Sequence, residues 1–246
     1  MNPLVVEQLT KRFGGLQALN GVDISIEPGA RRAIIGPNGA GKTTFFNLIT
    51  GTLPATSGRI LIFGQDVTDL PPHQRAQLGL ARTFQITTLF PNLTVLDNVL
   101  LAVQALDSVK FVLHRPRTAY PHLGTRAQKL LEEWGLAEQA GTPVRTLSYG
   151  EQRQLELILA LAGAPKLLLL DEPTAGLSPA ETATVTTMIK ALSRDMAILV
   201  IEHDMDVAFE LGDRITVLHQ GRVLAEGSGE EIRKNPEVAE IYLGAQ

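Results

Sequence analysis

The sequence contains no cysteine among its 246 residues, which excludes disulfide bonds and thiolate metal sites and is compatible with a reducing compartment. An excess of one charge sign is also missing. The chain has 22 basic and 26 acidic residues, a net charge of −4. A protein with this balance has no global attraction for nucleic acids or anionic lipids, so we expect no nucleic-acid partner.

Long hydrophobic runs are missing as well. The most apolar stretch, residues 155–170 (LELILALAGAPKLLLL), is interrupted by Glu156, Gly163, Pro165 and Lys166. It is also shorter than the roughly 20 residues that cross a bilayer. The first 13 residues lack the basic segment and apolar core of a secretory signal. We therefore expect that any role at a membrane depends on partner subunits that span it.

The sequence does contain an alternation of strand and helix patterns that predicts an α/β fold. Residues 3–9 and 21–29 read as an opening antiparallel pair. The continuous apolar segments 166–173 and 196–204 are typical of strands buried on both faces of a parallel sheet, and the helical segment 178–194 would connect them. We also expect strands at 31–36 and 58–64, a helix at 43–50 and a hairpin at 215–227.

The middle of the chain has a different pattern. Residues 93–106 and 125–134 carry apolar residues at helical spacing, and residues 107–122 between them resemble a loop. We therefore predict a single domain over residues 1–246. Its α/β core comprises residues 1–83 and 162–246, and an α-helical insert spans residues 84–161.

A phosphate-binding loop is the strongest local motif. The segment GPNGAGKT, residues 36–43, fits G-x-x-x-x-G-K-[ST] and lies between a predicted strand and a predicted helix. Its glycines let backbone N–H groups point at phosphate oxygens, and the helix adds its positive end. Lys42 supplies a charge for the outer phosphates, and Thr43 supplies a hydroxyl for Mg²⁺. A glycine-rich turn that merely caps a helix is the alternative, but both context and spacing favour the phosphate loop.

Two acidic residues, Asp171 and Glu172, follow four leucines. A buried parallel strand delivers its last residues to the sheet edge where ligands bind. There Asp171 would hold Mg²⁺, and Glu172 would orient or deprotonate the attacking water. Alone, the pair is equally compatible with an acidic turn. The phosphate loop in the same chain favours the catalytic interpretation.

Gln85 and His203 each follow a predicted strand and could reach the same edge. A glutamine can bind water or metal, and a histidine can donate a hydrogen bond to a terminal phosphate. In isolation, each is better explained as an ordinary loop residue. The remaining histidines show no metal-ligand spacing.

The segment LSYGEQRQLEL, residues 147–157, predicts a helix whose Ser148 and Glu151 form a capping box. With Gly150, this helix start is also an anion site that has no lysine of its own. Such a surface is poorly equipped to hold a triphosphate alone. We therefore expect it to close over the γ-phosphate of ATP bound to a second copy, in a head-to-tail dimer.

Taken together, the motifs GPNGAGKT, LARTFQ, LSYGEQ, LLLLDEPTAGLSPAE and VIEHD resemble those of ABC transporter ATPase cassettes over essentially the whole chain. The resemblance implies a P-loop NTPase core with a mostly parallel sheet, an N-terminal antiparallel β subdomain and an inserted α-helical subdomain. It also implies ATP hydrolysis with ATP and Mg²⁺ as cofactors, and a signature loop that acts across the dimer.

The resemblance assigns roles to residues that physical reasoning leaves ambiguous. Phe13 is similar to the aromatic residue that stacks on adenine, although core packing explains a lone phenylalanine equally well. Gln85 corresponds to the nucleotide-sensing glutamine, and His203 to the switch histidine. The expected catalytic residues are Glu172, His203 and Gln85, and the expected metal ligands are Thr43, Gln85 and Asp171. The expected nucleotide-binding residues are Phe13, Gly36, Pro37, Asn38, Gly39, Ala40, Gly41, Lys42, Thr43, Thr44, Ser148, Gly150 and Glu151.

Three residues depart from the common pattern of the family. Tyr149 and Glu151 replace a glycine and a glutamine of the signature, and Ser178 stands where many cassettes have an aspartate. Glu151 would place a carboxylate near the docking γ-phosphate unless it turns back to cap its helix. Ser178 lies in a loop that contacts the other subunit, so communication between the two sites is expected to differ.

The segments ARTFQ, YGEQR and GRVLAEGSGEEIRKNPEVAEIYLG resemble the importers of branched-chain amino acids. Importers of urea, short amides or aromatic solutes share these features, so those substrates stay open, as do an exporter and a soluble ATP-driven switch. The implied partners are an identical or sister cassette, two transmembrane permeases and, indirectly, a solute-binding protein. The implied location is the cytoplasmic face of the membrane, through the permeases. The basic loop 110–117 could lie near lipid headgroups, or simply be solvated.

Overall fold

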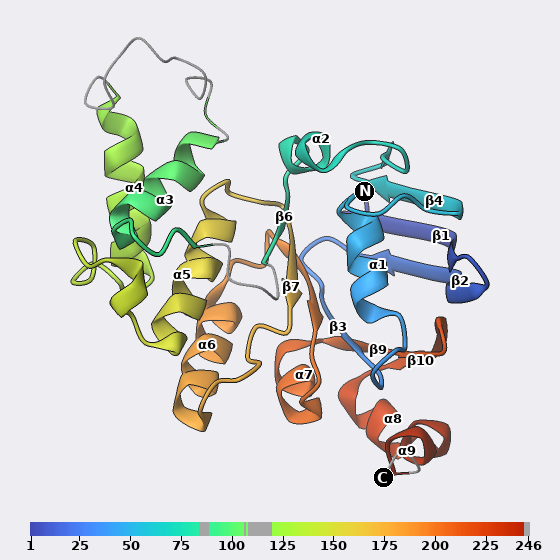
Figure 1. The fold of residues 1–246 in the computed structure, drawn as a ribbon. Helices are drawn as coiled ribbons and strands as arrows, with labels where there is room; N and C mark the ends of the chain where they lie inside the picture. The colour runs from blue at the N-terminus through green and yellow to red at the C-terminus, as the bar shows by residue number, and fades with distance from the viewer. Residues whose placement is uncertain (84–88, 106, 108–119, 244–246) are drawn as a thin grey trace.

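The computed structural model describes residues 1–83, 89–105, 107 and 120–243. Gln85 and the basic loop 110–117 lie outside these residues. Figure 1 shows the helices α3, α4 and α5 on one side of the molecule and the sheets on the other. Within the described residues, no helix has both the length and the apolar character that a membrane span requires.

A six-stranded sheet carries the centre of the fold, in the order β10-β9-β3-β8-β7-β6. All neighbouring strands are parallel except β9 and β10, which form the antiparallel hairpin expected at residues 215–227. Every residue of β3, β7 and β8 is buried. This burial explains why β8 and the four leucines of β7 are continuous apolar runs. The strands are β3 (Arg31–Ile35), β6 (Leu80–Arg82), β7 (Leu167–Asp171), β8 (Ala197–Ile201), β9 (Arg214–His219) and β10 (Arg222–Gly227).

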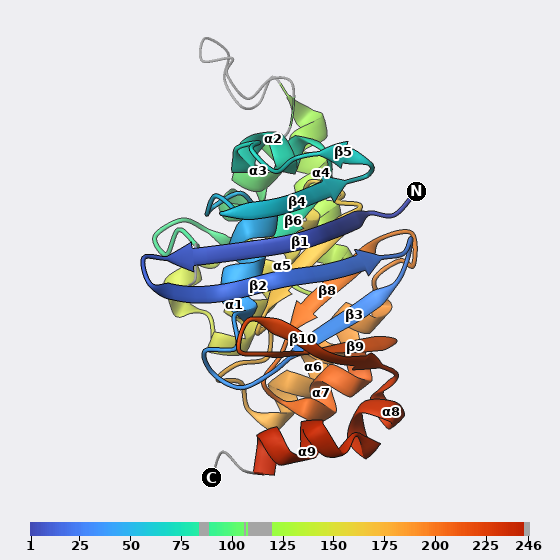
Figure 2. The same ribbon diagram turned by 90° about the vertical axis from the view of Figure 1, so that its right-hand side faces the viewer.

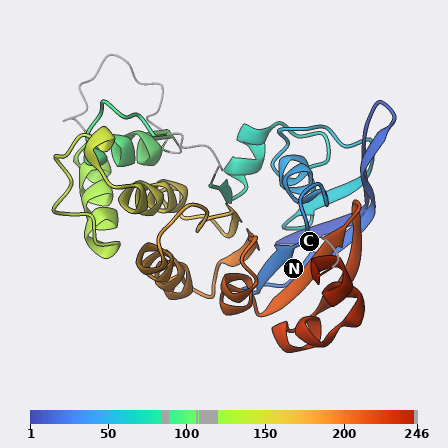
Figure 3. The ribbon, with the colours of Figure 1, turned by 60° about the horizontal axis from the view of Figure 1, so that its bottom comes forward.

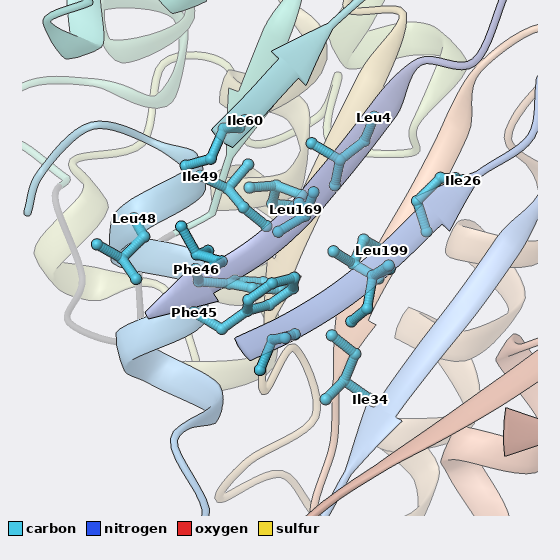
Figure 4. Packing of buried hydrophobic residues seen from close by; sticks show 14 of the residues in the cluster. Leu4, Ile26, Ile34, Phe45, Phe46, Leu48, Ile49, Ile60, Leu169 and Leu199 are labelled. Carbon is cyan, nitrogen blue, oxygen red and sulfur yellow. The ribbon is translucent and has the colours of Figure 1, made fainter. Parts of the chain in front are cut away.

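A four-stranded antiparallel sheet covers one face of this core, in the order β2-β1-β4-β5. It comprises β1 (Leu4–Phe13), β2 (Leu16–Ile26), β4 (Ser57–Ile62) and β5 (Gln65–Asp66). Helix α1 (Lys42–Ile49) packs between the two sheets (Figures 2 and 4). Its Phe45 and Phe46 are fully buried against residues of both sheets, such as Leu4 and Leu199. This packing fixes the helix that follows the phosphate loop.

The opposite face of the six-stranded sheet is covered by helices α6 (Pro179–Ala191), α7 (Met205–Leu211), α8 (Gly229–Lys234) and α9 (Pro236–Leu243). Figure 2 shows α8 and α9 together beside the hairpin β9–β10, near the C-terminus. None of α7, α8 and α9 is anticipated by the helical spacing of the sequence, because each is only six to eight residues long.

The remaining helices are α2 (Pro72–Gln77), α3 (Val95–Ala105), α4 (Pro121–Glu133), α5 (Tyr149–Leu161) and the 3₁₀ turn Val144–Thr146. Helices α3, α4 and α5 share a hydrophobic core of their own, apart from the sheets (Figure 3). Helix α5 contributes to two cores, because Leu155 and Ile158 face α3 and α4 while Leu157 packs with the sheet residues. It therefore joins the helical part to the α/β part.

These observations confirm the predicted fold class: an α/β core with a mostly parallel sheet and an N-terminal antiparallel sheet. One expectation was wrong in detail. Pro121 and His122 were placed in the loop 107–122, but α4 begins at Pro121. Proline is well tolerated in the first helical turn because the N–H that it lacks has no partner there.

Candidate functional site

The phosphate loop connects β3 to α1 and depends on glycines where no side chain fits. At Gly36, a Cβ atom would lie 2.1 Å from the carbonyl oxygen of Leu218 in the neighbouring strand. Gly41 has φ +104°, and a Cβ atom there would lie 2.7 Å from the carbonyl oxygen of Ala18. The loop is thus held close to β2 and β9, with the start of α1 immediately behind it.

Lys42 is the first residue of α1, and its side chain is buried against the phosphate loop. Its Nζ donates hydrogen bonds to the carbonyl oxygens of Gly36 at 2.6 Å and Pro37 at 3.2 Å. Burial lowers the pKa of Lys42, while the carboxylates of Glu172 and Asp171 act in the opposite direction. The ammonium group therefore lies within the electrostatic reach of both carboxylates that the sequence singled out.

A cavity of about 580 Å³ opens over this loop. It is lined by residues 38–44 together with Phe13, Glu172 and His203, so the structure brings together most of the predicted site. Its volume is in the range of small-molecule sites. Ser148, Gly150 and Glu151 are not among the described residues that line it. The cavity also includes Leu16, Gln17, Ala18 and Gln220, which no sequence motif indicated.

Phe13 is the aromatic wall of this cavity. Its side chain is 45% exposed, and the Nζ of Lys11 lies 5.0 Å from the centre of its ring. This exposure argues against core packing, the alternative that the sequence left open. An exposed ring at the rim of a phosphate cavity is placed to stack on a planar base.

Asp171 is the last residue of β7, Glu172 follows it at the sheet edge, and the two have different surroundings. Asp171 is 1% exposed, and its Oδ2 accepts a hydrogen bond from Arg82 Nη2 at 2.6 Å. Within the described part of the chain, its Oδ1 is buried and has no hydrogen-bond partner. Glu172 has the unusual φ of +49° for a residue other than glycine, held by an N–H bond to Ile201 O at 2.9 Å.

His203 lies across from Glu172, as its position after β8 suggested. Its Nε2 contacts Glu172 Oε1, while nearly half of its side chain, 46%, stays exposed toward the cavity. Two adjacent parallel strands, β7 and β8, deliver this pair. The arrangement places an acid–base pair beside the phosphate loop.

Glu202 is a buried acidic residue in the same region that sequence reasoning missed. Its Oε1 accepts hydrogen bonds from the N–H of Thr174 at 3.2 Å and the hydroxyl of Thr174 at 2.8 Å. Its Oε2 accepts one from the N–H of His203 at 3.3 Å. Burial raises the pKa of Glu202 to about 7. A carboxylate directly after the apolar run 197–201 was the available signal, since a charge so placed needs partners.

The residues present fit Mg²⁺. Among the described residues, Asp171 Oδ1 has no hydrogen-bond donor, and the exposed residue Thr43 supplies a hydroxyl in the first turn of α1. The described residues contain no cluster of three or more histidine and acidic side chains that would enclose an ion. Mg²⁺ suits such a site, because it is commonly held by one or two protein oxygens together with phosphate oxygens and water. The third predicted ligand, Gln85, lies outside the described residues.

The start of α5 has the predicted capping box. Ser148 Oγ accepts the N–H of Glu151 at 3.2 Å, and Glu151 Oε2 accepts the N–H of Ser148 at 2.7 Å. Glu151 therefore turns back onto its own helix, which answers the concern that its carboxylate would face a docking phosphate.

Tyr149 and Ser178, the other two departures, connect α5 to the loop after β7. The Tyr149 hydroxyl donates to Ala175 O at 3.4 Å and accepts from Arg153 Nη2 at 2.9 Å. Ser178 caps α6 in a second box with Glu181. The other oxygen of this carboxylate, Glu181 Oε1, accepts the N–H of Gly150 at 3.1 Å. Glu181 is a second residue that sequence reasoning missed, because its bond to Gly150 is a tertiary contact.

The geometry agrees with similarities to known proteins. Residues 19–175 match the family described as ABC transporter, and residues 222–246 match the branched-chain amino acid ATP-binding cassette transporter. The sequence is 44% identical to the high-affinity branched-chain amino acid transport ATP-binding protein LivG of Escherichia coli, over 98% of this chain and 97% of the relative.

Two solved structures are similar over most of this chain. A nucleotide-free ATP-binding cassette from an ABC transporter has a TM-score of 0.86 and 32% identity, covering 98% of this chain and 99% of that one. A dimeric post-hydrolysis cassette bound to ADP and Pi has a TM-score of 0.78 and 28% identity, covering 92% of this chain and 98% of that one.

Proposed function

Because this chain belongs to the ABC transporter family of ATP-binding cassettes, we propose that it hydrolyses ATP to power the import of branched-chain or other hydrophobic amino acids. The observation that carries the proposal is the cavity where Lys42, Glu172 and His203 meet the phosphate loop and Phe13. The substrate class rests on the relative LivG and on the match of residues 222–246.

In the proposed reaction, the phosphate loop and Lys42 hold the β- and γ-phosphates, and Phe13 stacks on adenine. Glu172 orients the attacking water and accepts its proton. His203, which contacts Glu172, donates a hydrogen bond to the γ-phosphate. Thr43, Asp171 and Gln85 would hold Mg²⁺, which when bound would neutralise charge at the phosphates. Gly36–Thr44 and these residues form one half of the site.

A second cassette completes the site in this proposal. Ser148 and Gly150 would close over the ATP of the partner, and the partner would do the same in return. The support is that the signature residues do not line the cavity of their own chain, within the described residues. The similar cassette bound to ADP and Pi is itself dimeric. Whether the partner is identical or a sister chain is left open.

An apolar groove gives the proposed permeases a place to dock. It has a volume of about 440 Å³ and lies among α2, β6, α3 and α5, with Pro72, Ala76, Leu80, Ala102, Ala105 and Leu159 in its walls. The exposed lining is mostly apolar, so a hydrophobic segment of a partner fits it. Two permeases would hold the chain at the cytoplasmic face of the membrane, and a solute-binding protein would act through them.

Reconstitution with the permeases and the solute-binding protein tests this function. We expect ATP-dependent uptake of labelled leucine, isoleucine or valine into vesicles, and its loss in K42A, because Lys42 is the residue proposed to hold the phosphates. Urea, acetamide and an aromatic amino acid are the comparison solutes. Uptake of urea or acetamide without uptake of leucine would overturn the amino-acid assignment, while an ATPase that co-purifies with no permease would overturn the importer itself.

A further inference from the structure

Arg82 is a buried arginine that connects three parts of the molecule. It ends β6, and its side chain is only 6% exposed. Its Nη2 donates to Asp171 Oδ2 at 2.6 Å, and its Nη1 donates to Asn47 Oδ1 at 2.6 Å and to Thr50 Oγ1 at 3.4 Å. The guanidinium also lies 5.6 Å from the centre of the Phe46 ring. It thus ties the end of β7 to helix α1.

The ion pair with Arg82 gives the two carboxylate oxygens of Asp171 different environments. Oδ2 is taken by Arg82, while Oδ1 is buried and without a hydrogen-bond partner among the described residues. A buried carboxylate oxygen with no donor is costly unless a cation completes it. Because the guanidinium is planar and is fixed by Asn47 on its other side, it also fixes the direction in which Oδ1 points.

Arg82 reaches the apolar groove as well. It lines that groove together with Leu80 and Ala81 of the same strand. Arg82 therefore borders the surface proposed for the permease, and its side chain contacts the acid proposed for the metal. The sequence around Arg82 indicates no role for it, because an arginine at the end of a three-residue strand resembles an ordinary solvated charge.

We propose that Arg82 is a positioning residue for Mg²⁺ binding: it orients Asp171 Oδ1 toward the ion and connects that orientation to the lining of the apolar groove. The inference rests on the proposed magnesium role of Asp171. In this proposal Arg82 acts through Asp171 and is not itself a ligand of the ion. Partners of this kind change metal affinity by roughly 10- to 100-fold when they are replaced.

A second buried arginine offers a matched control. Arg75 is 1% exposed and donates to the carbonyl oxygens of Leu48 and Ile49 at the end of α1. It supports the same helix as Arg82, but within the described residues its guanidinium donates to backbone carbonyls and not to Asp171. Replacing it reports the effect of loosening α1 without disturbing the carboxylate.

The test compares the full-length parent with R82K, R75K and N47A. Mn²⁺ replaces Mg²⁺, and its binding to the complex with a non-hydrolysable ATP analogue is followed by the loss of the free Mn²⁺ EPR signal. We expect R82K to raise the half-saturating Mn²⁺ concentration roughly tenfold. Analogue affinity in EDTA should stay within about twofold of the parent, because the phosphate loop is intact. R75K should lower the melting temperature with no such shift.

N47A removes only the outer support of Arg82, so it should shift Mn²⁺ binding in the same direction by less. If R82K does not fold, Mn²⁺ binding by N47A decides whether Arg82 positions Asp171 for the ion. Parental Mn²⁺ binding in R82K, or in N47A if R82K is unfolded, would overturn the inference, as would an equal shift in R75K. If the parent itself binds the analogue but no Mn²⁺, the magnesium role in the proposed function fails, and the inference fails with it.

Discussion

Glu202 shows how single residues set the geometry between the two loops of the site. Its carboxylate bonds Thr174, two residues after Glu172, and the backbone of His203. Burial is the largest cause of its raised pKa, and the hydrogen bonds oppose it. A carboxyl that is protonated near neutral pH can hold these loops without adding another full charge beside Glu172.

This residue predicts a pH dependence of stability. The pKa of Glu202 is raised from 4.5 to about 7 on folding, so the folded chain retains a proton that the unfolded chain releases. The resulting stabilisation is present in full below pH 4.5 and is lost as the pH rises through about 7. Between pH 5.5 and 8, the melting temperature of the parent should therefore fall further than that of E202Q, by roughly 4–8 °C. Thermal melts at several pH values measure this, and parallel curves would contradict it.

At the scale of elements, the start of α5 is joined to the start of α6 by the Glu181 carboxylate. One oxygen accepts from Ser178 and the other from Gly150. Hydrogen bonds from Ser178, and to a lesser extent from Gly150, lower the pKa of Glu181, so it is ionised at neutral pH. In the proposed dimer, the same Gly150 N–H would bind the γ-phosphate of the partner's ATP. The carboxylate and the phosphate would then compete for it.

Removing this carboxylate should make closure over ATP easier. We expect E181A to lower the ATP concentration for half-maximal hydrolysis by roughly fivefold, the scale of one net hydrogen bond. E231A is the control, because Glu231 forms the same capping box with Ser228 at α8, away from the signature residues. Both variants should lower the melting temperature. An identical ATP dependence in E181A and E231A would show that Glu181 only caps its helix.

Some elements of the fold and of the site could be predicted from the sequence, and others could not. The strands around the phosphate loop and the helix α1 were predictable because their patterns are local: apolar runs, a glycine motif and a helix start. The capping box at Ser148 was predictable for the same reason. Three tertiary contacts could not be predicted in this way: Arg82 with Asp171, Glu181 with Gly150, and Glu202 with Thr174. Each joins residues from 28 to 89 positions apart, which only the sheet order brings together.

For the whole molecule, the main consequence of the proposed function is that one chain carries half of each site. E172Q should keep ATP binding while it slows turnover by roughly 10²- to 10⁴-fold, because the general base is lost. Bound ATP would then hold two chains together. Light scattering should detect an E172Q dimer with ATP and Mg²⁺ and a monomer with ADP. Parental turnover in E172Q would contradict the assignment of the base, and full activity in a strict monomer would contradict the shared site.

Helix α5 connects the signature residues to the apolar groove. Its first turn holds Ser148 and Gly150, its middle packs into both the helical core and the sheet core, and Leu159 near its far end borders the apolar groove. Under the proposed function, a permease segment that pushes on the groove tilts α5, the same helix whose start covers the ATP of the partner. Movement of the permease and closure over the nucleotide then both correspond to a displacement of this one helix, and no further element is needed to couple them.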